Sequence, residues 1–504
     1  MTITINGLLG SGQKLASERH QFFIKELSDC LELKIKTPLK SWIQVLLWDP
    51  DGNLRLQCLH LKEASCIPIH VDPLQNYPAA IPGKIVAGEY TLEVIGNGFQ
   101  SIPYVIEVRA EMSANDENRN HLTYEIWSNG DYAHGPLLLN CYDAEKMIDA
   151  GVKWYKGDFH THTNLSDGKL SQVELLHQAE QMELDFIVAT DHNILPVMWV
   201  KGNVLVIPGM EITSQSSHFN AIGLNIWLDF RGSCYDLGLY SEQGMNRLLS
   251  EAKEKGALCS INHPALAPWQ WEYTDTLLAN VDMLEIINDP TYPGNKEATE
   301  KALELWTATW NEGYHIWGIG GSDSHLLPTE TYEGASSPSL VGDPGTYVLS
   351  NGLSAKEIIN AVRQGRVYVS RGIKLNIKIR CQGQCFFPGD DLTSLFTHAE
   401  DEHAVVYCIK LIDSKDNYDL TIIENGVSIV TMGIESEVTY QIPVMWKGSQ
   451  YVWNRLDIRN AHEEMVLFTN PVYKGGKTHT IAKFGELQEL VRRSLGEKYS
   501  RRTI

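Results

Sequence analysis

Short apolar runs with strand character alternate with helical stretches between about residues 154 and 375. The apolar runs are "DFIVAT", "VLVIPG", "NAIGLN", "ALCSIN", "DMLEII" and "HIWGIG". The helical patterns are "SQVELLHQAEQMEL", "EQGMNRLLSEAKEKG" and "NKEATEKALELWTATWNEG". Such alternation predicts a parallel β/α architecture, and near-continuous apolar strands predict a sheet buried on both faces. We therefore expect a β/α barrel in this region.

The flanking regions have a different texture. Residues 1–110 alternate apolar and polar residues over short runs, as in "LELKIK" and "GEYTLEVIG", which is typical of a β-sandwich. Residues 111–153 read as a polar connector with a helix near "DAEKMIDAG", ahead of a barrel at 154–373. Alternation returns at 374–478, predicting a second β-sandwich, and 479–504 read as a helix with a basic tail.

The bulk composition narrows the functional classes. The 504-residue chain carries 42 Lys and Arg against 63 Asp and Glu, a net charge of −21. This average charge repels a phosphate backbone, so nucleic acid is not expected as a primary partner. Bound metal ions would still provide a local cationic site for one small anion. A homo-oligomer stays open.

The cellular location of the protein and the state of its cysteines are predicted from the segments and cysteine spacings of the sequence. It has no apolar run of 18 residues and no basic segment followed by an apolar one at its start, so we expect no membrane span and a cytoplasmic protein. The nine cysteines are scattered, which does not predict a disulfide framework. Cys381 and Cys385, in "CQGQC", have no second pair nearby for a zinc or redox site.

Metal-binding residue types follow the predicted strands of the middle region. "GDFHTHTNLSDG" places His160 and His162 two apart, so both imidazoles share one face of a strand. The apolar run "DMLEII" similarly leads to Glu285 and Asn288. The ligand-type residues at the strand ends are His160, His162, Asp167, His192, Glu211, His218, His263, Asp323 and His325. A single histidine there is more often packed or exposed than a ligand, but six such positions point to a site at the carboxyl ends of the strands. Nine donors exceed the need of one tetrahedral ion and suit two or three metals with bridging carboxylates.

The motifs "HTHTNLSDG", "ATDHN", "PGMEIT", "HFNAIG", "NHP" and "GSDSH" occur in this order over a little under half the chain. In this the chain resembles the polymerase and histidinol phosphatase (PHP) superfamily. The resemblance implies a distorted (β/α)7 barrel, a cluster of two or three divalent metal ions (manganese, iron or zinc) and phosphoesterase activity.

The resemblance also implies individual roles. The implied ligands are His160 and His162 in the first motif, Asp167 after it, His192 in the second, Glu211 as the bridging carboxylate, His218 and His263 as the later histidines, and Asp323 and His325 in the final Asp-x-His. We expect His160, His162, Glu211 and Asp323 to hold the metal pair that carries the hydroxide. Catalysis is assigned to Asp323, Glu211 and His218.

The edges of the region resemble a narrower group. "WYKGDFHTHT", "GSDSHLLP", "GRVYVSRG" and "LFTNPVY", with the β-rich N-terminal region, look like CehA/McbA-type metallohydrolases. That branch includes enzymes that cleave aryl carbamate esters as well as presumed phosphoesterases.

The chemistry follows from the donors. A water shared by two divalent ions ionises near neutral pH, and the ions polarise a phosphoryl or carbonyl oxygen. Histidine and carboxylate donors without thiolate favour zinc, manganese or iron. Asp191 is expected to orient an imidazole or, alternatively, to cap a helix. Asn220 either binds substrate or braces the barrel, and Cys259 is expected in the core.

Substrate contacts are harder to assign. Arg366 and Arg371 are candidate phosphate clamps, with surface ion pairs as the alternative. Trp269 and Trp271 follow His263 on a loop and would line an apolar pocket or pack within the loop. An aromatic pocket without a close arginine would favour a carbamate or carboxyl ester.

Three functions are weighed. The first is a metal-dependent phosphoesterase acting on a small-molecule phosphate mono- or diester. The second is a carboxyl or carbamate ester hydrolase on the same metals, and the third is a non-catalytic binding scaffold, which the complete ligand set disfavours. DNA polymerase proofreading is disfavoured by the net charge, whereas an exonuclease for short oligonucleotides stays open.

Overall fold

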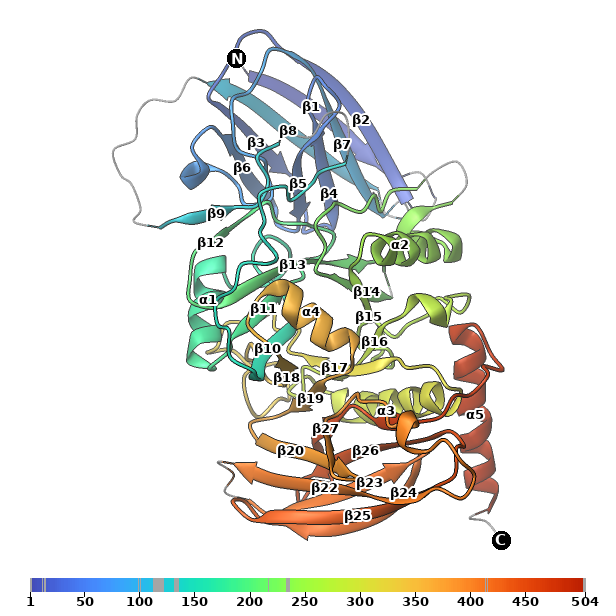
Figure 1. The fold of residues 1–504 in the computed structure, drawn as a ribbon. Helices are drawn as coiled ribbons and strands as arrows, with labels where there is room; N and C mark the ends of the chain where they lie inside the picture. The colour runs from blue at the N-terminus through green and yellow to red at the C-terminus, as the bar shows by residue number, and fades with distance from the viewer. Residues whose placement is uncertain are drawn as a thin grey trace.

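The computed structural model describes residues 2–10, 12, 15–97, 99, 101–111, 122–130, 136–215, 217–232, 236–412, 414 and 416–501. Figure 1 shows three regions in line, with the N-terminal sheets at one end and the C-terminal sheets at the other. None of the helices in these residues combines the length and the hydropathy that a bilayer-spanning segment requires. The cysteines among them are free thiols, as expected, and Cys234 lies outside the described residues.

The N-terminal region consists of two four-stranded antiparallel sheets, with strand orders β1-β8-β3-β6 and β2-β7-β4-β5. The strands are β1 Thr2–Leu9, β2 Leu15–Ile24, β3 Cys30–Lys36, β4 Ile43–Trp48, β5 Leu54–His60, β6 Ala64–His70, β7 Gly88–Asn97 and β8 Ile102–Glu111. In β3 and β8, buried and more accessible residues alternate, as the pleat of a sheet with one buried face requires. A shared apolar core lies between the sheets.

The connector differs from its prediction. The helix expected near "DAEKMIDAG" is wrong, because residues 143–151 form turns and an isolated bridge. Asp143 accepts a hydrogen bond from the backbone N–H of Glu145, and Asp149 accepts one from that of Gly151. Aspartate closes turns in this way and so competes with helix formation. Residues 112–121 of the predicted polar connector lie outside the described residues.

The central region is mixed α/β and rich in sheet. Its strands are β10 Lys153–Thr161, β11 Phe186–Ala189, β13 Leu205–Thr213, β14 His218–Ile222, β15 Leu258–Ile261, β16 Met283–Asn288, β17 Trp317–Gly321, β18 Gly345–Ser350 and β19 Val367–Ser370. Its helices are α1 Gln172–Gln181, α2 Glu242–Glu254, α3 Asn295–Asn311 and α4 Ala355–Arg363. A small separate sheet pairs β9 Tyr124–Ile126 with β12 Met198–Val200.

A regular strand–helix repeat is not present in the described part of this region. β10, β11 and β13 are parallel, as are β15, β16 and β17, but β14 is antiparallel to both of its neighbours. Antiparallel strands need only a short link, so no helix separates β13 from β14. The sequence therefore predicted the α/β class and the helices α1, α2 and α3 but not α4, while a (β/α)7 barrel is not clearly formed.

The central sheet curls so that its edge strand β17 approaches β10. The backbone N–H of Asp323 donates to the carbonyl of His160 at 2.9 Å, and Thr161 forms a parallel bridge with Ser324. Gly321 allows this approach, since a Cβ there would lie 2.4 Å from the Cβ of His160. Histidines at the end of β10 and the aspartate after β17 are thus brought together.

The C-terminal strands continue the central sheet through the pairing of β19 with β27. The strands are β20 Lys374–Cys381, β21 Gln384–Phe386, β22 Glu402–Ile412, β23 Tyr418–Glu424, β24 Val427–Ile434, β25 Thr439–Lys447, β26 Val452–Arg459, β27 Met465–Thr469 and β28 Val472–Lys474. β21, β20, β22 and β25 form a separate sheet. The predicted terminal helix is present as α5, Phe484–Arg501, which contacts α3 (Figure 1). The domain limits at 373 and 478 stay predictions.

Candidate metal centre

Three overlapping groups of metal-type donors converge in the central region. In each group, one donor atom from every residue lies within 4.8 Å of the others. The groups are His162, Asp167, His192 and His325; His160, His162 and Glu211; and His192, Glu211 and His218. Because the groups share residues, the structure assembles one cluster with several neighbouring positions for an ion.

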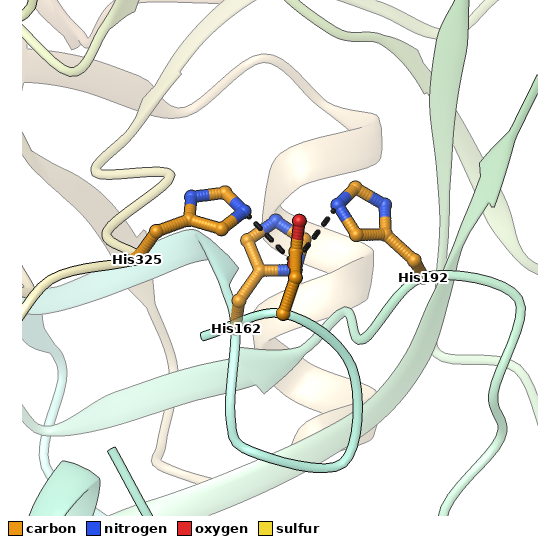
Figure 2. A group of neighbouring side chains, drawn as sticks. His162, His192 and His325 are labelled. Carbon is orange, nitrogen blue, oxygen red and sulfur yellow. Dashed lines mark ion pairs between the residues drawn. The ribbon is translucent and has the colours of Figure 1, made fainter. Parts of the chain in front are cut away.

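Asp167 joins two of the histidines. Its Oδ1 lies 3.1 Å from Nε2 of His325 and 3.3 Å from Nε2 of His192. Figure 2 shows these two imidazoles on either side, with His162 between them. The ring of His162 stacks on both, with centroids 4.3 Å from His325 and 4.4 Å from His192. This arrangement turns four donor side chains toward one point.

Glu211 occupies the middle of the cluster. Its carboxylate oxygens lie 2.6 Å from Nδ1 of His192, 3.2 Å from Nε2 of His160 and 3.2 Å from Nδ1 of His218. Asn262 donates a hydrogen bond to Oε1 at 2.7 Å, which fixes the orientation of the carboxylate. A fully buried carboxylate that faces imidazoles on both oxygens is suited to bridge two cations.

Asp323 forms the third carboxylate of the cluster. Its Oδ1 lies 2.9 Å from Nε2 of His162 and 3.2 Å from Nε2 of His160, and its Oδ2 accepts from Asn288 at 3.2 Å. His263 lies beside the cluster, with Nε2 3.8 Å from Glu211. Asp323 and His263 have positive φ angles of 47° and 31°, in the left-handed region that costs most residues energy. Each lies two residues after the end of a strand, His263 after β15 and Asp323 after β17.

Hydrogen bonds hold the Nδ1 atoms of two imidazoles, those of His160 and His325. Nδ1 of His160 lies 3.0 Å from Oε1 of Glu285, whose other oxygen accepts from the backbone N–H of His263. Nδ1 of His325 lies 2.7 Å from the carbonyl of Asp323. Such contacts select the tautomer that leaves Nε2 free for a metal. Glu285 therefore supports the ligands, although the sequence offered it only as a residue near the site.

The cluster fits divalent metal ions. Among the described residues, Nε2 of His160, both ring nitrogens of His162, Oδ1 of Asp167 and Oε2 of Glu211 are buried without a hydrogen-bond partner. Unsatisfied buried polar atoms cost free energy, and cations shared by these donors would remove the cost. Imidazole nitrogens and carboxylate oxygens without thiolate suit zinc, manganese or iron.

The charged groups of the cluster shift one another's pKa values. Burial lowers the pKa of His162 to about 3, with further lowering from His325 and His192, so its ring nitrogens are neutral donors. Burial opposes the charge on His325, but Asp167 outweighs this and raises the pKa of His325 to about 9. Burial also opposes the charge on Asp167, yet His192 and His325 together lower its pKa.

Asp191 has a different role from the one expected. It accepts hydrogen bonds from the backbone and hydroxyl of Thr163 at 2.8 Å and from the hydroxyl of Ser166 at 2.6 Å. It therefore holds the loop that leads to Asp167, rather than an imidazole or a helix end. The sequence shows only that Asp191 is next to His192. It does not reveal the bond to Ser166, which is 25 residues away along the chain.

A cavity of about 450 Å³ opens above the cluster. It is lined by the cluster residues Asp167, His192, His218, His263, Asp323 and His325, by Thr213, Ser214, Gln215, Asn288 and Asp289, and by Trp42, Ile102, Tyr240, Leu266, Trp269, Tyr292 and Tyr332. None of these described lining residues is a lysine or an arginine. Trp269 thus lines the cavity, and its contact with substrate stays a prediction.

The other expected substrate contacts lie elsewhere. Arg366 pairs with Asp390 at 3.3 Å, and Arg371 forms two hydrogen bonds of 3.1 Å with Asp343. Neither arginine lines the cavity, so the geometry does not support the phosphate clamp expected from the sequence.

Three further side chains take structural positions. Asn220 donates to the carbonyl of Phe159 at 3.2 Å and so braces β14 against β10. Trp271 is buried and donates to Thr276, which is loop packing. Cys259 is buried in the core, as predicted.

Several residues at the site carried no signal in the sequence. Asn262 lies in the "NHP" motif, in which His263 is the residue of a metal-ligand type. Trp42 belongs to the N-terminal sandwich, and only the packing of the two regions brings it to the cavity. Tyr292 and Tyr332 lie in irregular segments between strands, where no periodicity singles them out.

Comparison with known proteins gives partial matches. No protein-family profile matches the chain. The chain is 32% identical over 113 residues to the 5'-3' exoribonuclease Rnm of Escherichia coli (strain K12), and the match covers 20% of this chain and 39% of the relative. The Rnm of Salmonella typhimurium is 29% identical over 110 residues, covering 19% and 38%. The chain therefore spans well under half the length of these relatives.

Solved structures show weak likeness. A two-domain protein containing a predicted PHP-like metal-dependent phosphoesterase, from Bacteroides vulgatus, has a TM-score of 0.35 and 18% identity, over 63% of this chain and 95% of that one. An amidohydrolase from Chromobacterium violaceum has a TM-score of 0.22 and 12% identity, over 35% and 89%.

Proposed function

We propose that this protein is a metal-dependent hydrolase of the PHP superfamily, in its CehA/McbA-type branch, and that it cleaves a small phosphate mono- or diester. The observation that carries the proposal is the cluster itself: three carboxylates, each facing at least two imidazoles, of which Glu211 is fully buried and Asp167 and Asp323 line one cavity. We also propose that the curled central sheet is a distorted (β/α)7 barrel. The cytoplasmic location and a homo-oligomeric state stay predictions.

Two or three metal ions would be held by the nine residues of the cluster. His160, His162, Glu211 and Asp323 would hold one pair, and Asp167, His192, His218, His263 and His325 would complete it or hold a third ion. Bound divalent ions would supply hydroxide at neutral pH and polarise the oxygen of the ester.

The protein's own groups prepare this site. Asn262 fixes Glu211 and Glu285 fixes His160, so the donors do not need to reorganise when an ion enters. Asn288 holds Asp323 in the same way. With the donors preset, the ester is positioned by the walls of the cavity, which exclude part of the surrounding water.

A phosphate ester is supported by the partial match to two exoribonucleases, whose name describes cleavage of RNA. The cavity lining supports a second candidate, a carboxyl or carbamate ester, because it is aromatic and carries no arginine or lysine among its described residues. For a phosphate substrate, the metals would have to supply all of the positive charge next to the anion.

The test is turnover of matched p-nitrophenyl esters by protein reconstituted with manganese, zinc or iron. The panel contains the phosphate, a phosphodiester, the acetate and a carbamate. Asp323→Ala removes a carboxylate that faces His160 and His162 and is expected to lower turnover at least a hundredfold and to reduce the bound metal. Asp419→Ala, at an exposed position of β23, is the matched control and should behave as wild type.

The outcomes separate the candidates. Metal-dependent turnover of phosphate or phosphodiester supports the leading proposal. Turnover of only the acetate or carbamate selects the second candidate. Activity that survives in Asp323→Ala, or that does not depend on metal, contradicts both.

A further inference from the structure

The cavity above the cluster is built by two regions of the chain. Most of its lining comes from segments that follow central strands, but Trp42 and Ile102 belong to the N-terminal sandwich. Trp42 directly precedes β4, and its ring centroid lies 5.3 Å from that of His192 at an interplanar angle of 61°. A residue of the sandwich therefore reaches the metal ligands.

Hydrogen bonds and an ion pair hold the sandwich at this position. The side-chain amide of Gln57 donates to the carbonyl of Leu195 at 3.0 Å and accepts from the N–H of the same residue at 3.0 Å. Arg231 pairs with Glu93 of β7 at 2.7 Å. These contacts are buried or half-buried, so Trp42 is a preformed part of the cavity.

A second set of aromatic rings lines the same cavity. Trp269 contacts Tyr292 edge to face with centroids 5.9 Å apart, and Tyr292 contacts Tyr332 edge to face at 5.1 Å. All three side chains are half-buried, whereas the neighbouring Trp271 is buried and bonded within its loop. Rings that support one another and remain partly accessible are suited to receive a flat apolar group.

We propose that Trp42 is a specificity-determining residue and that, with the aromatic set of Trp269, Tyr292 and Tyr332, it holds a flat apolar group attached to the ester. This inference rests on the proposed function, since it concerns the part of the substrate next to the bond that the metal site cleaves. It makes the N-terminal sandwich a part of the active site. Small alkyl esters would lack the group that these rings contact.

The test compares two stable anions with the same charged head, phenylphosphonate and methylphosphonate. Their dissociation constants are measured by calorimetry on the metal-loaded full chain. The wild type is expected to prefer the phenyl compound, and Trp42→Ala to reduce this preference about tenfold, which corresponds to the loss of one ring contact. Trp42→Phe keeps a ring and is expected to restore most of the preference.

Trp48→Ala is the matched control. Trp48 lies at the same junction, under Arg231 and 6.1 Å from Trp227, but does not line the cavity. Its replacement should leave the phenyl preference unchanged. The bound metal of each variant is measured in parallel, because Trp42 contacts His192.

The results separate the proposed role of Trp42 from the proposed hydrolase function. An unchanged phenyl preference in Trp42→Ala overturns the inference, as does a loss that follows the loss of metal or that Trp48→Ala reproduces. Equal binding of both phosphonates by the wild type overturns the inference but leaves metal-dependent hydrolysis standing. Binding of neither, together with no turnover of any ester, overturns the proposed function as well.

Discussion

At the scale of single residues, Glu211 has the most demanding position. A fully buried carboxylate is costly unless it is paired, and here His160, His192 and His218 surround it and lower its pKa well below the usual range against the effect of burial. The same arrangement that keeps it charged makes it available to two cations. The carboxylate oxygens of Glu211 and the facing imidazole nitrogens therefore balance charge inside the protein, and the same atoms are the candidate metal donors.

Arg366 and Arg371 are expected to matter little for catalysis. Each forms an ion pair with an aspartate outside the cavity. Exchange of either for alanine should change kcat/KM by less than roughly threefold, since partly exposed ion pairs contribute little. Steady-state kinetics on the p-nitrophenyl panel checks this. A tenfold rise of KM for the phosphate alone would show that one of them reaches the substrate.

Asp289 lines the cavity and is expected to make stability depend on pH. Burial raises its pKa to about 6, and the charge of Asp323 adds to the shift. Folding therefore favours the protonated carboxyl of Asp289. The folding stability that this protonated group contributes is fully present below about pH 4, near its ordinary pKa, and is lost as the pH rises through 6. Asp289→Asn, which keeps an acceptor for Thr291, should gain up to about 3 kcal/mol over wild type at high pH.

The Asp289 prediction is checked by unfolding the chelator-treated protein at pH 5 and pH 8. The difference between variant and wild type should be larger at pH 8. An equal difference at both values would mean that Asp289 is ionised throughout this range.

At the scale of elements, the segment after β11 joins the two regions. It carries His192, and three residues later Leu195 exchanges two hydrogen bonds with the buried amide of Gln57. The N–H of Val197 donates to the carbonyl of Pro78 a short distance further on. A candidate metal ligand, His192, is therefore positioned by contacts between its own region of the chain and the N-terminal region.

Gln57→Ala is expected to destabilise this segment. It leaves the N–H and the carbonyl of Leu195 buried without partners, at a cost of about 2–5 kcal/mol. The unfolding temperature and the retained metal should both fall, as measured by thermal unfolding and metal analysis. Gln21→Ala, at an exposed position of β2, is the control. Full metal retention in Gln57→Ala would show that the sandwich does not position His192.

At the scale of the whole molecule, metal binding and folding are coupled. An ion that binds only the folded cluster stabilises it by about 2.7 kcal/mol at one hundred times its dissociation constant. Chelation should therefore lower the unfolding temperature, and added zinc or manganese should restore it. Calorimetric scans with and without chelator measure the shift; equal scans would contradict a metal-filled cluster.

The same coupling gives the metal affinity a pH dependence. His325 has a pKa raised to about 9 in the metal-free protein, so an ion must displace its proton at neutral pH. Affinity is therefore expected to rise from pH 6 toward pH 9. Metal titration at several pH values checks the direction.

The sequence by itself indicated the donor side chains that the structure brings together, and it indicated the α/β class. Donors at i and i+2, as in His160 and His162, share a face in any strand, and donors placed after successive strands meet at one edge of a sheet. Local periodicity likewise located α1, α2, α3 and α5. These features depend on neighbours in the chain, which the sequence displays.

Only the tertiary structure decided the rest. The return of β17 to β10 and the arrival of Trp42 beside His192 depend on contacts between segments far apart in the chain. The side chains of Arg366 and Arg371 were directed by aspartates 24 and 28 residues away. Such pairings are set by packing and charge in three dimensions, for which a local pattern of residues contains no signal.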